Sequence, residues 1–347
     1  MTMENILSLP VKPPQPAQSQ RWLGWLLRHR EASLSAVLLV IVLGTSLVHP
    51  NFLSAQSIKD IILNVSIIAL LTVGLTVVML MRHIDLSIGS TLGLSAFLVG
   101  DLFSRFPHVP VAAAIAIGVL IGLLAGAVNG LLVTWGRVPS LVATLSTLYI
   151  FRGIDYAWVG GREINATVLP ENFAVLGSGS FLGLPYMAMI AFGLLLLLAY
   201  YLKNFRGGRE FYAIGSNHEG ARLAGINVAY REFSGFLLCG AIAGLAGVLW
   251  LARFGSVNAS SGNGIELQVV AAAVVGSVSI AGGSGSVLGA ALGALLLAVI
   301  ASALVILHVS GFWQLAIQGA LILLAITGDT LLSRMLARQT VRRNNHV

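Results

Sequence analysis

The sequence predicts an all-α polytopic membrane protein with about ten transmembrane helices, some of them short or interrupted. Of its 347 residues, 57% are hydrophobic and only 10% are charged, and the mean hydropathy is +0.90. A water-soluble fold has too few polar groups here to cover so much apolar surface, whereas a bilayer solvates that surface without penalty. The apolar residues also gather in windows long enough to cross the hydrocarbon core as helices.

A polar, proline-rich stretch precedes the first apolar window. Residues 1–32 are therefore predicted to form a cytoplasmic N-terminal tail, residues 33–330 the transmembrane domain, and residues 331–347 a basic cytoplasmic C-terminal tail. The predicted spans are 33–49, 58–81, 85–103, 109–135, 139–159, 186–202, 232–252, 267–281, 286–307 and 312–330. The stretches 86–100, 138–151 and 267–281 each hold only about 14–15 apolar residues before a charge or a Gly-Gly pair interrupts them, which is short for a span and typical of interrupted helices.

Basic residues divide unequally between the two sides of this predicted arrangement. With ten crossings and a cytoplasmic N-terminus, only four of the 20 Lys and Arg residues fall in loops on the far side, namely Lys59, Arg105, Arg162 and Arg253. The positive-inside rule therefore predicts that both termini are cytoplasmic. The net charge of +7 reflects this topology, so lipid is the expected environment and no nucleic-acid partner is expected.

Hydrophilic segment 203–231, on the predicted cytoplasmic side, contains the signals of a short helix. Ser216 and Glu219 have the spacing of a capping box, and Gly225 supplies a left-handed stop. Asn217, His218 and Arg222 complete the set of residues assigned to this helix. Two interpretations are open: a solvated connector that happens to be helical, or a rigid element that receives a push from a cytoplasmic partner.

Four polar residues within or beside the predicted spans are candidates for a polar pathway. A buried Asp85 is costly unless it is paired or wetted, and the alternative is that Asp85 and Ser87 serve the free N–H groups of a helix start. Arg152 and Asp155, three residues apart on one helix, either neutralise each other or face the pathway. Asn129 either lines the pathway or forms hydrogen bonds between helices.

Glycine recurs at helical spacing in two predicted spans. Small residues on one helix face let a neighbouring helix approach closely, and mobile hinges are the alternative. The residues are Gly118, Gly122, Gly126, Gly130, Gly240, Gly244 and Gly247.

Several motifs that would indicate an enzyme or a cofactor site are missing from the sequence. None of its lysines, Lys12, Lys59 and Lys203, completes a phosphate-binding loop of the G-x-x-x-x-G-K-[ST] type. Its seven histidines lack paired ligand spacing, and its single cysteine, Cys239, cannot form an internal disulfide. We therefore expect no catalytic residue, no metal site and no cofactor bound by this chain.

Several strings taken together resemble the membrane permease subunits of ABC importers for ribose, xylose, rhamnose and autoinducer-2, in the branched-chain amino acid/ribose permease family. The resemblance covers most of residues 55–330, although His83 stands where that family usually has a small or polar residue. The strings are HIDLSIGSTLGL (83–94), VPSLVATLSTLYIFRGI (138–154), GSFLGLP (179–185), GREFYAIGSNHEGARLAGINV (208–228), SGFLLCGAIAGLAGVLW (234–250) and GNGIELQVVAAAVVGSVSIAGGSGSVLGAALGA (262–294).

The resemblance implies a set of partners in a bacterial inner membrane. Two such subunits, identical or similar, would enclose the pathway, and the helix Ser216–Gly225 would dock into a cytoplasmic ABC ATPase that uses ATP and Mg. A periplasmic solute-binding protein would deliver the solute, for which Arg162, Glu163 and Glu171 offer docking charges unless they belong to a solvated connector. The implied solute is a monosaccharide or sugar-like molecule such as ribose or rhamnose, with autoinducer-2 as the alternative.

Two other classes of transport protein remain open at this point. An ion-coupled secondary transporter would need carboxylates or histidines deep in its spans, where only Asp155 clearly qualifies. A passive channel would need no capped cytoplasmic helix.

Overall fold

The computed structural model describes residues 30–314, 316–317, 319–320, 323–324 and 327. Residues 1–29 of the predicted N-terminal tail, the whole predicted C-terminal tail and much of the tenth window lie outside these described residues. The long helices are α2 (Arg30–Val48), α3 (Ala55–Leu80), α4 (Ile88–Arg105), α5 (Val111–Thr134), α6 (Ser140–Val159), α8 (Tyr186–Asn204), α11 (Val228–Phe254) and α13 (Val287–Ile306). Shorter elements are η2 (Pro50–Leu53), η3 (Ala166–Val168), α7 (Glu171–Ser178), α9 (Arg206–Ser216), α10 (His218–Leu223), α12 (Ile265–Val275), and a two-stranded antiparallel hairpin of β1 (Ser180–Phe181) and β2 (Leu184–Pro185).

The prediction of an all-α polytopic membrane protein is confirmed. Each predicted window that falls on described residues contains a helix. Among the described residues, 6 helices are long and apolar enough to cross a membrane, namely α2, α3, α5, α8, α11 and α13. The chain is therefore a multi-pass membrane protein.

The predicted interruptions are right in one place and wrong in two. Helix α12 has only 11 residues and is followed by a non-helical segment, 276–286, in which Ser277, Gly282 and Gly283 all have positive φ. In contrast, all but the first two residues of each of the stretches 86–100 and 138–151 lie in the continuous helices α4 and α6, of 18 and 20 residues. Their charges do not break these helices because each is paired, Asp101 with Arg105 and Arg162, and Arg152 with Asp155.

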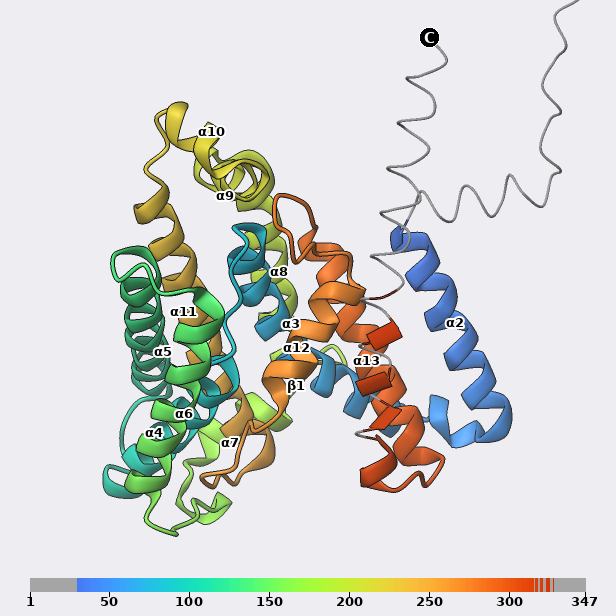
Figure 1. The fold of residues 1–347 in the computed structure, drawn as a ribbon. Coiled ribbons are helices and arrows are strands. Elements are labelled where there is room, and N and C mark those ends of the chain that lie inside the picture. The colour runs from blue at the N-terminus through green and yellow to red at the C-terminus, as the bar shows by residue number, and fades with distance from the viewer. Residues whose placement is uncertain (1–29, 315, 318, 321–322, 325–326, 328–347) are drawn as a thin grey trace, which may run out of the picture.

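Helices α3 and α11 are the most deeply buried of the candidate spans, and α2 lies at the edge of the molecule (Figure 1). In the most apolar window of α3 and of α11, 72% of the residues are buried, against 6% in α2. On α2, the exposed apolar side chains include Leu39, Val40, Leu43 and Leu47, a surface suited to lipid. Figure 1 also places α9 and α10 at one end of the bundle and α7 at the opposite end.

The glycine stripes pack α5 directly against α11. A Cβ atom at Gly122 would overlap the backbone of Gly240 and Gly244, and one at Gly244 would overlap the carbonyl of Gly118. Ser95 of α4 joins the same contact, because its hydroxyl donates to the carbonyl oxygen of Gly244 at 2.9 Å. The predicted role of these glycines in close helix packing is confirmed.

Candidate functional site

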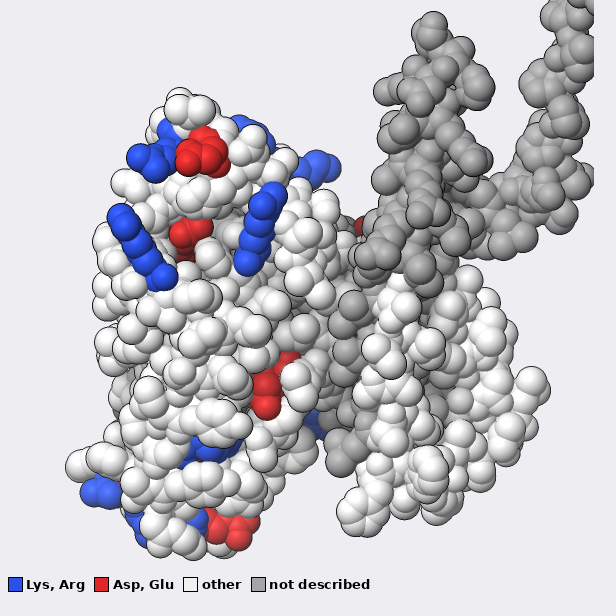
Figure 2. Space-filling view, viewed as in Figure 1, with Lys and Arg blue, Asp and Glu red and all other residues white. Residues whose placement is uncertain are grey.

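Charged side chains gather on the end of the molecule that carries α9 and α10, and again on the opposite end (Figure 2). The surface between them is predominantly uncharged. We call the first the coupling end, defined by α9, α10 and the ends of α3 and α11 that meet them. It contains every residue predicted for the short capped helix.

Helix α10 is the predicted short helix, but its cap differs by one residue from the prediction. Ser216 is the last residue of α9, and Asn217, with extended backbone, caps α10 by accepting from the Gly220 N–H at 2.9 Å. The Ser216–Glu219 capping box was therefore wrong: with Asn217 as the cap, Gly220 and not Glu219 occupies the third helical position.

The predicted stop at Gly225 is confirmed. Gly225 has φ of 81° and donates to the carbonyl of Arg222 at 3.0 Å, while Ile226 donates to that of Ala221 at 3.1 Å. This pair of hydrogen bonds is a Schellman motif, which satisfies carbonyls that the helix end would otherwise leave free. Both ends of α10 are thus fixed by local hydrogen bonds.

Helix α9 is fastened to the end of α3 and to segment 276–286. The Arg82 guanidinium donates to the carbonyls of Gly215 at 2.6 Å and Ser216 at 3.0 Å. Gly283 donates to the Leu80 carbonyl at 2.9 Å, and a Cβ at Gly215 would overlap that same carbonyl. The C-terminal turn of α9, directly before α10, is therefore held in close contact with the bundle.

A carboxylate on α11 connects α10 to the segment between α3 and α4. One oxygen of Glu232 lies 3.1 Å from Nε2 of His83 and 3.6 Å from Nε2 of His218, the first residue of α10. Nε2 of His83 makes no well-aligned hydrogen bond. Its contact with Glu232 is therefore purely electrostatic, and it is an ion pair only when the imidazole is protonated. His83, the residue at which the chain departs from the family pattern, therefore lies beside Glu232 at the coupling end.

Most of α10 faces away from the protein. Of its six residues only Ala221 is buried, and Leu223 is 86% exposed. Glu219 and Arg222 are exposed beside it. Helix α10 therefore presents mainly polar and charged side chains together with one exposed leucine.

Two of the predicted pathway residues, Asp85 and Asn129, belong to one buried hydrogen-bond network. Asp85 accepts from the Ser87 N–H at 2.9 Å and its hydroxyl at 2.7 Å, and Asn129 of α5 donates to the Ser87 hydroxyl at 2.7 Å. Thr147 of α6 donates to the Asn129 carbonyl at 2.6 Å. The alternative that Asp85 and Ser87 serve the free N–H groups at the start of α4 is right for Asp85, which accepts from the Ser87 N–H, and wrong for Ser87, whose hydroxyl bonds to Asp85 instead. The network joins α5 and α6 to the start of α4, and a pathway role for Asp85 and Asn129 stays a prediction.

Arg152 and Asp155 form the predicted pair. Their closest charged atoms lie 3.7 Å apart, and the two side chains are 10% and 0% exposed. The Arg152 guanidinium also donates to the carbonyls of Ala259 at 2.9 Å and Ser261 at 2.7 Å. Arg152 thus holds the segment before α12 in place, and its role in the pathway stays a prediction as well.

On the end opposite α10, the three predicted docking charges are exposed. Arg162 is also engaged within the protein, where it donates to Asp101 at 2.9 Å. Glu163 and Glu171 make no hydrogen bond or ion pair with any residue that the structure describes.

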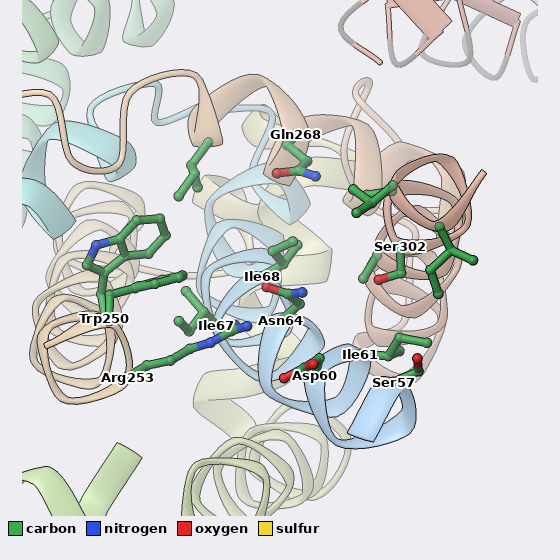
Figure 3. A pocket seen from close by; sticks show the side chains of 16 residues that line it. Ser57, Asp60, Ile61, Asn64, Ile67, Ile68, Trp250, Arg253, Gln268 and Ser302 are labelled. Carbon is green, nitrogen blue, oxygen red and sulfur yellow. The ribbon is translucent and has the colours of Figure 1, made fainter. Parts of the chain in front are cut away.

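A pocket of about 370 Å³ lies between α3, α11, α12 and α13. We call it the polar pocket. Figure 3 shows Asn64 of α3, Gln268 of α12 and Ser302 of α13 around it, with Asp60, Arg253 and Trp250 toward one side. The prediction from the sequence singled out none of these residues as a candidate site. The described residues contain no group of three or more His, Cys, Asp or Glu that could hold a metal ion.

A family model described as "Branched-chain amino acid transport system / permease component" matches residues 57–326. The chain belongs to this permease family. The coupling end and the polar pocket both lie within the matched part of the permease.

The permease is similar to autoinducer-2 import system permease proteins LsrC. It is 37% identical to that of Salmonella typhi over 91% of its own length and 89% of the relative's. It is also 37% identical to those of Escherichia coli (strain K12 / DH10B) and Shigella flexneri, over 91% of both chains in each case. No solved structure matches the permease.

Proposed function

We propose that this permease imports a small sugar-like solute of the autoinducer-2 type, as one subunit of an ABC importer in a bacterial inner membrane. The curated relatives, which align over nearly the whole chain, are autoinducer-2 import permeases. They favour autoinducer-2 over ribose, rhamnose and other monosaccharides. Both termini and α10 would then lie in the cytoplasm, in keeping with the unequal distribution of Lys and Arg.

The observation that carries the proposal is the geometry of α10. It is capped at both ends, and its side chains are largely exposed. Its neighbour α9 is bonded to the bundle through Arg82, and Glu232 of α11 lies 3.6 Å from His218 of α10. A contact on α10 would therefore be transmitted to α3 and α11 and would not be absorbed by a flexible loop.

The energy would come from partners and not from this chain. ATP and Mg would bind a cytoplasmic ABC ATPase, whose closure favours one access state of the permease through its differential contacts with α10. A second permease subunit would complete the pathway, and a periplasmic binding protein would deliver the solute at the α7 end, where Glu163 and Glu171 are exposed.

Reconstitution tests the proposal. Proteoliposomes that contain the permease with its partner ATPase and binding protein should accumulate autoinducer-2 only when ATP is supplied to the α10 side. Uphill accumulation by the permease alone in an ion gradient would contradict the proposal and identify a secondary transporter. Uptake of D-ribose but not autoinducer-2 would retain the ATP-driven mechanism and replace the solute.

A further inference from the structure

The polar pocket contains three uncharged polar side chains that lack protein partners. Asn64, Gln268 and Ser302 come from three different helices and line the same space (Figure 3). None of them makes a side-chain hydrogen bond to another residue within the described part of the chain. In a membrane helix, such a group is costly unless it meets water, a ligand or another subunit.

Other polar side chains on α3, the helix that carries Asn64, do have hydrogen-bond partners within the protein. On α3, Ser66, Thr72 and Thr76 each donate to the carbonyl four residues earlier at 2.7 Å. The buried Asn129 is likewise fully engaged with Ser87 and Thr147. Because these polar groups of α3 and α5 are paired within the protein, the unpaired set in the polar pocket points to something that binds there.

The remaining walls of the pocket narrow the chemistry of that ligand. Asp60 and Arg253 extend toward one another at one side (Figure 3), so the pocket presents both signs of charge and no excess of either. Trp250 and Phe254 add aromatic surface. Two amides, a hydroxyl and an aromatic wall suit an uncharged ring that carries several hydroxyl groups, and about 370 Å³ is at the small end of ligand pockets.

We propose that the polar pocket binds the transported solute, an uncharged polyhydroxylated molecule, through the side chains of Asn64, Gln268 and Ser302. This assignment rests on the proposed import function and adds to it the place of binding. The pocket lies where α3 begins and α11 ends, opposite α10. In the proposed orientation, that end faces the periplasm, from which the solute arrives.

The first test replaces the amides in the complete transporter. Asn64→Leu and Gln268→Leu should each raise the KM for autoinducer-2 uptake about tenfold, the effect of one lost solute hydrogen bond. ATP hydrolysis stimulated by the binding protein should persist, since neither residue lies near α10. Thr72→Val, on α3 but outside the pocket, should leave the KM unchanged.

The outcomes separate the inference from the function on which it rests. If the wild-type transporter takes up autoinducer-2 and both variants match it, the pocket assignment is overturned while import stands. If the variants fail to assemble with the second permease subunit, these amides are subunit contacts and the assignment is again overturned. If the wild-type transporter takes up neither autoinducer-2 nor D-ribose, the proposed function itself fails.

A second test places a new cysteine in the pocket after the single natural cysteine, Cys239, which is buried in α11, has been removed. In a Cys239→Ala background, Ser302→Cys should react with a small water-soluble methanethiosulfonate, and saturating autoinducer-2 should slow the reaction at least about tenfold. An unreactive thiol would show that water does not reach the pocket. A reaction rate that autoinducer-2 does not change would show that the solute binds elsewhere, and either result overturns the assignment.

Discussion

Arg152 supports the membrane domain in a way that a pair of substitutions can isolate. Arg152→Ala would leave Asp155 as a fully buried carboxylate without its counter-ion, and would also leave the Ala259 and Ser261 carbonyls without their donor. Removing one partner of a buried ion pair costs about 3–5 kcal/mol. Each abandoned carbonyl adds about 1–3 kcal/mol where water does not replace the guanidinium.

Combining Arg152→Ala with Asp155→Ala should restore the part of this loss that comes from the stranded charge, about 3 kcal/mol, but not the part that comes from the carbonyls. The assay is the midpoint of unfolding of the purified permease in detergent, with the yield of monodisperse protein as a second measurement. Arg105→Ala is the matched control, because Arg105 pairs with Asp101 from an exposed position and such pairs contribute about 0.2–1 kcal/mol.

Two results would refute this reasoning. If Arg152→Ala is as stable as the control, the buried pair does not support the fold. If Arg152→Ala is stable but transport is lost, the guanidinium acts in the pathway, which is the alternative that the sequence left open.

Three further substitutions and one control substitution test the packing and the coupling end. Gly122→Ala should prevent the close contact of α5 and α11 and abolish recovery of folded protein, whereas Gly153→Ala, which has open space around it, should be recovered normally. Asn217→Ala should remove the α10 cap, at a cost of about 1 kcal/mol, and lower ATP-driven uptake with normal membrane insertion. Glu219→Arg leaves that cap intact, so it should lower uptake only by weakening the binding of the ATPase, which co-purification measures. Unchanged binding and uptake would exclude Glu219 from the interface with the ATPase.

The spans were predictable from the sequence because apolar length alone determines whether a helix crosses lipid. The same criterion failed for α4 and α6, which looked interrupted by charge. Asp101 pairs with Arg105, four residues away, and with Arg162, sixty-one residues away in sequence, and only the first of these partners could be read from local spacing. The pair Arg152 and Asp155 was predictable because three residues of separation on one helix fix its geometry.

Helix α10 shows the same limit on a smaller scale. Local rules identified its stop at Gly225, since only the backbone there decides the outcome. Its start was displaced by one residue because Ser216 still belongs to α9, so that Asn217 supplies the cap, and the end of α9 is held by Arg82, 134 residues away in sequence. The polar pocket had no sequence signal, because Asn64, Gln268 and Ser302 are isolated residues in three apolar runs and only the packing of the helices brings them together.

Helices α3 and α11 connect the two sites. Helix α3 contributes Asn64 to the polar pocket and ends at Leu80, whose carbonyl is bonded at the coupling end. Helix α11 contributes Trp250 and Arg253 to the pocket, and carries Glu232 beside α10 at its other end. Because both helices are continuous and tightly packed, a displacement imposed on α10 would reach the wall of the pocket that α3 and α11 form. A solute held by hydrogen bonds from α3, α12 and α13 together would lose part of them in that movement, which is the condition for releasing it.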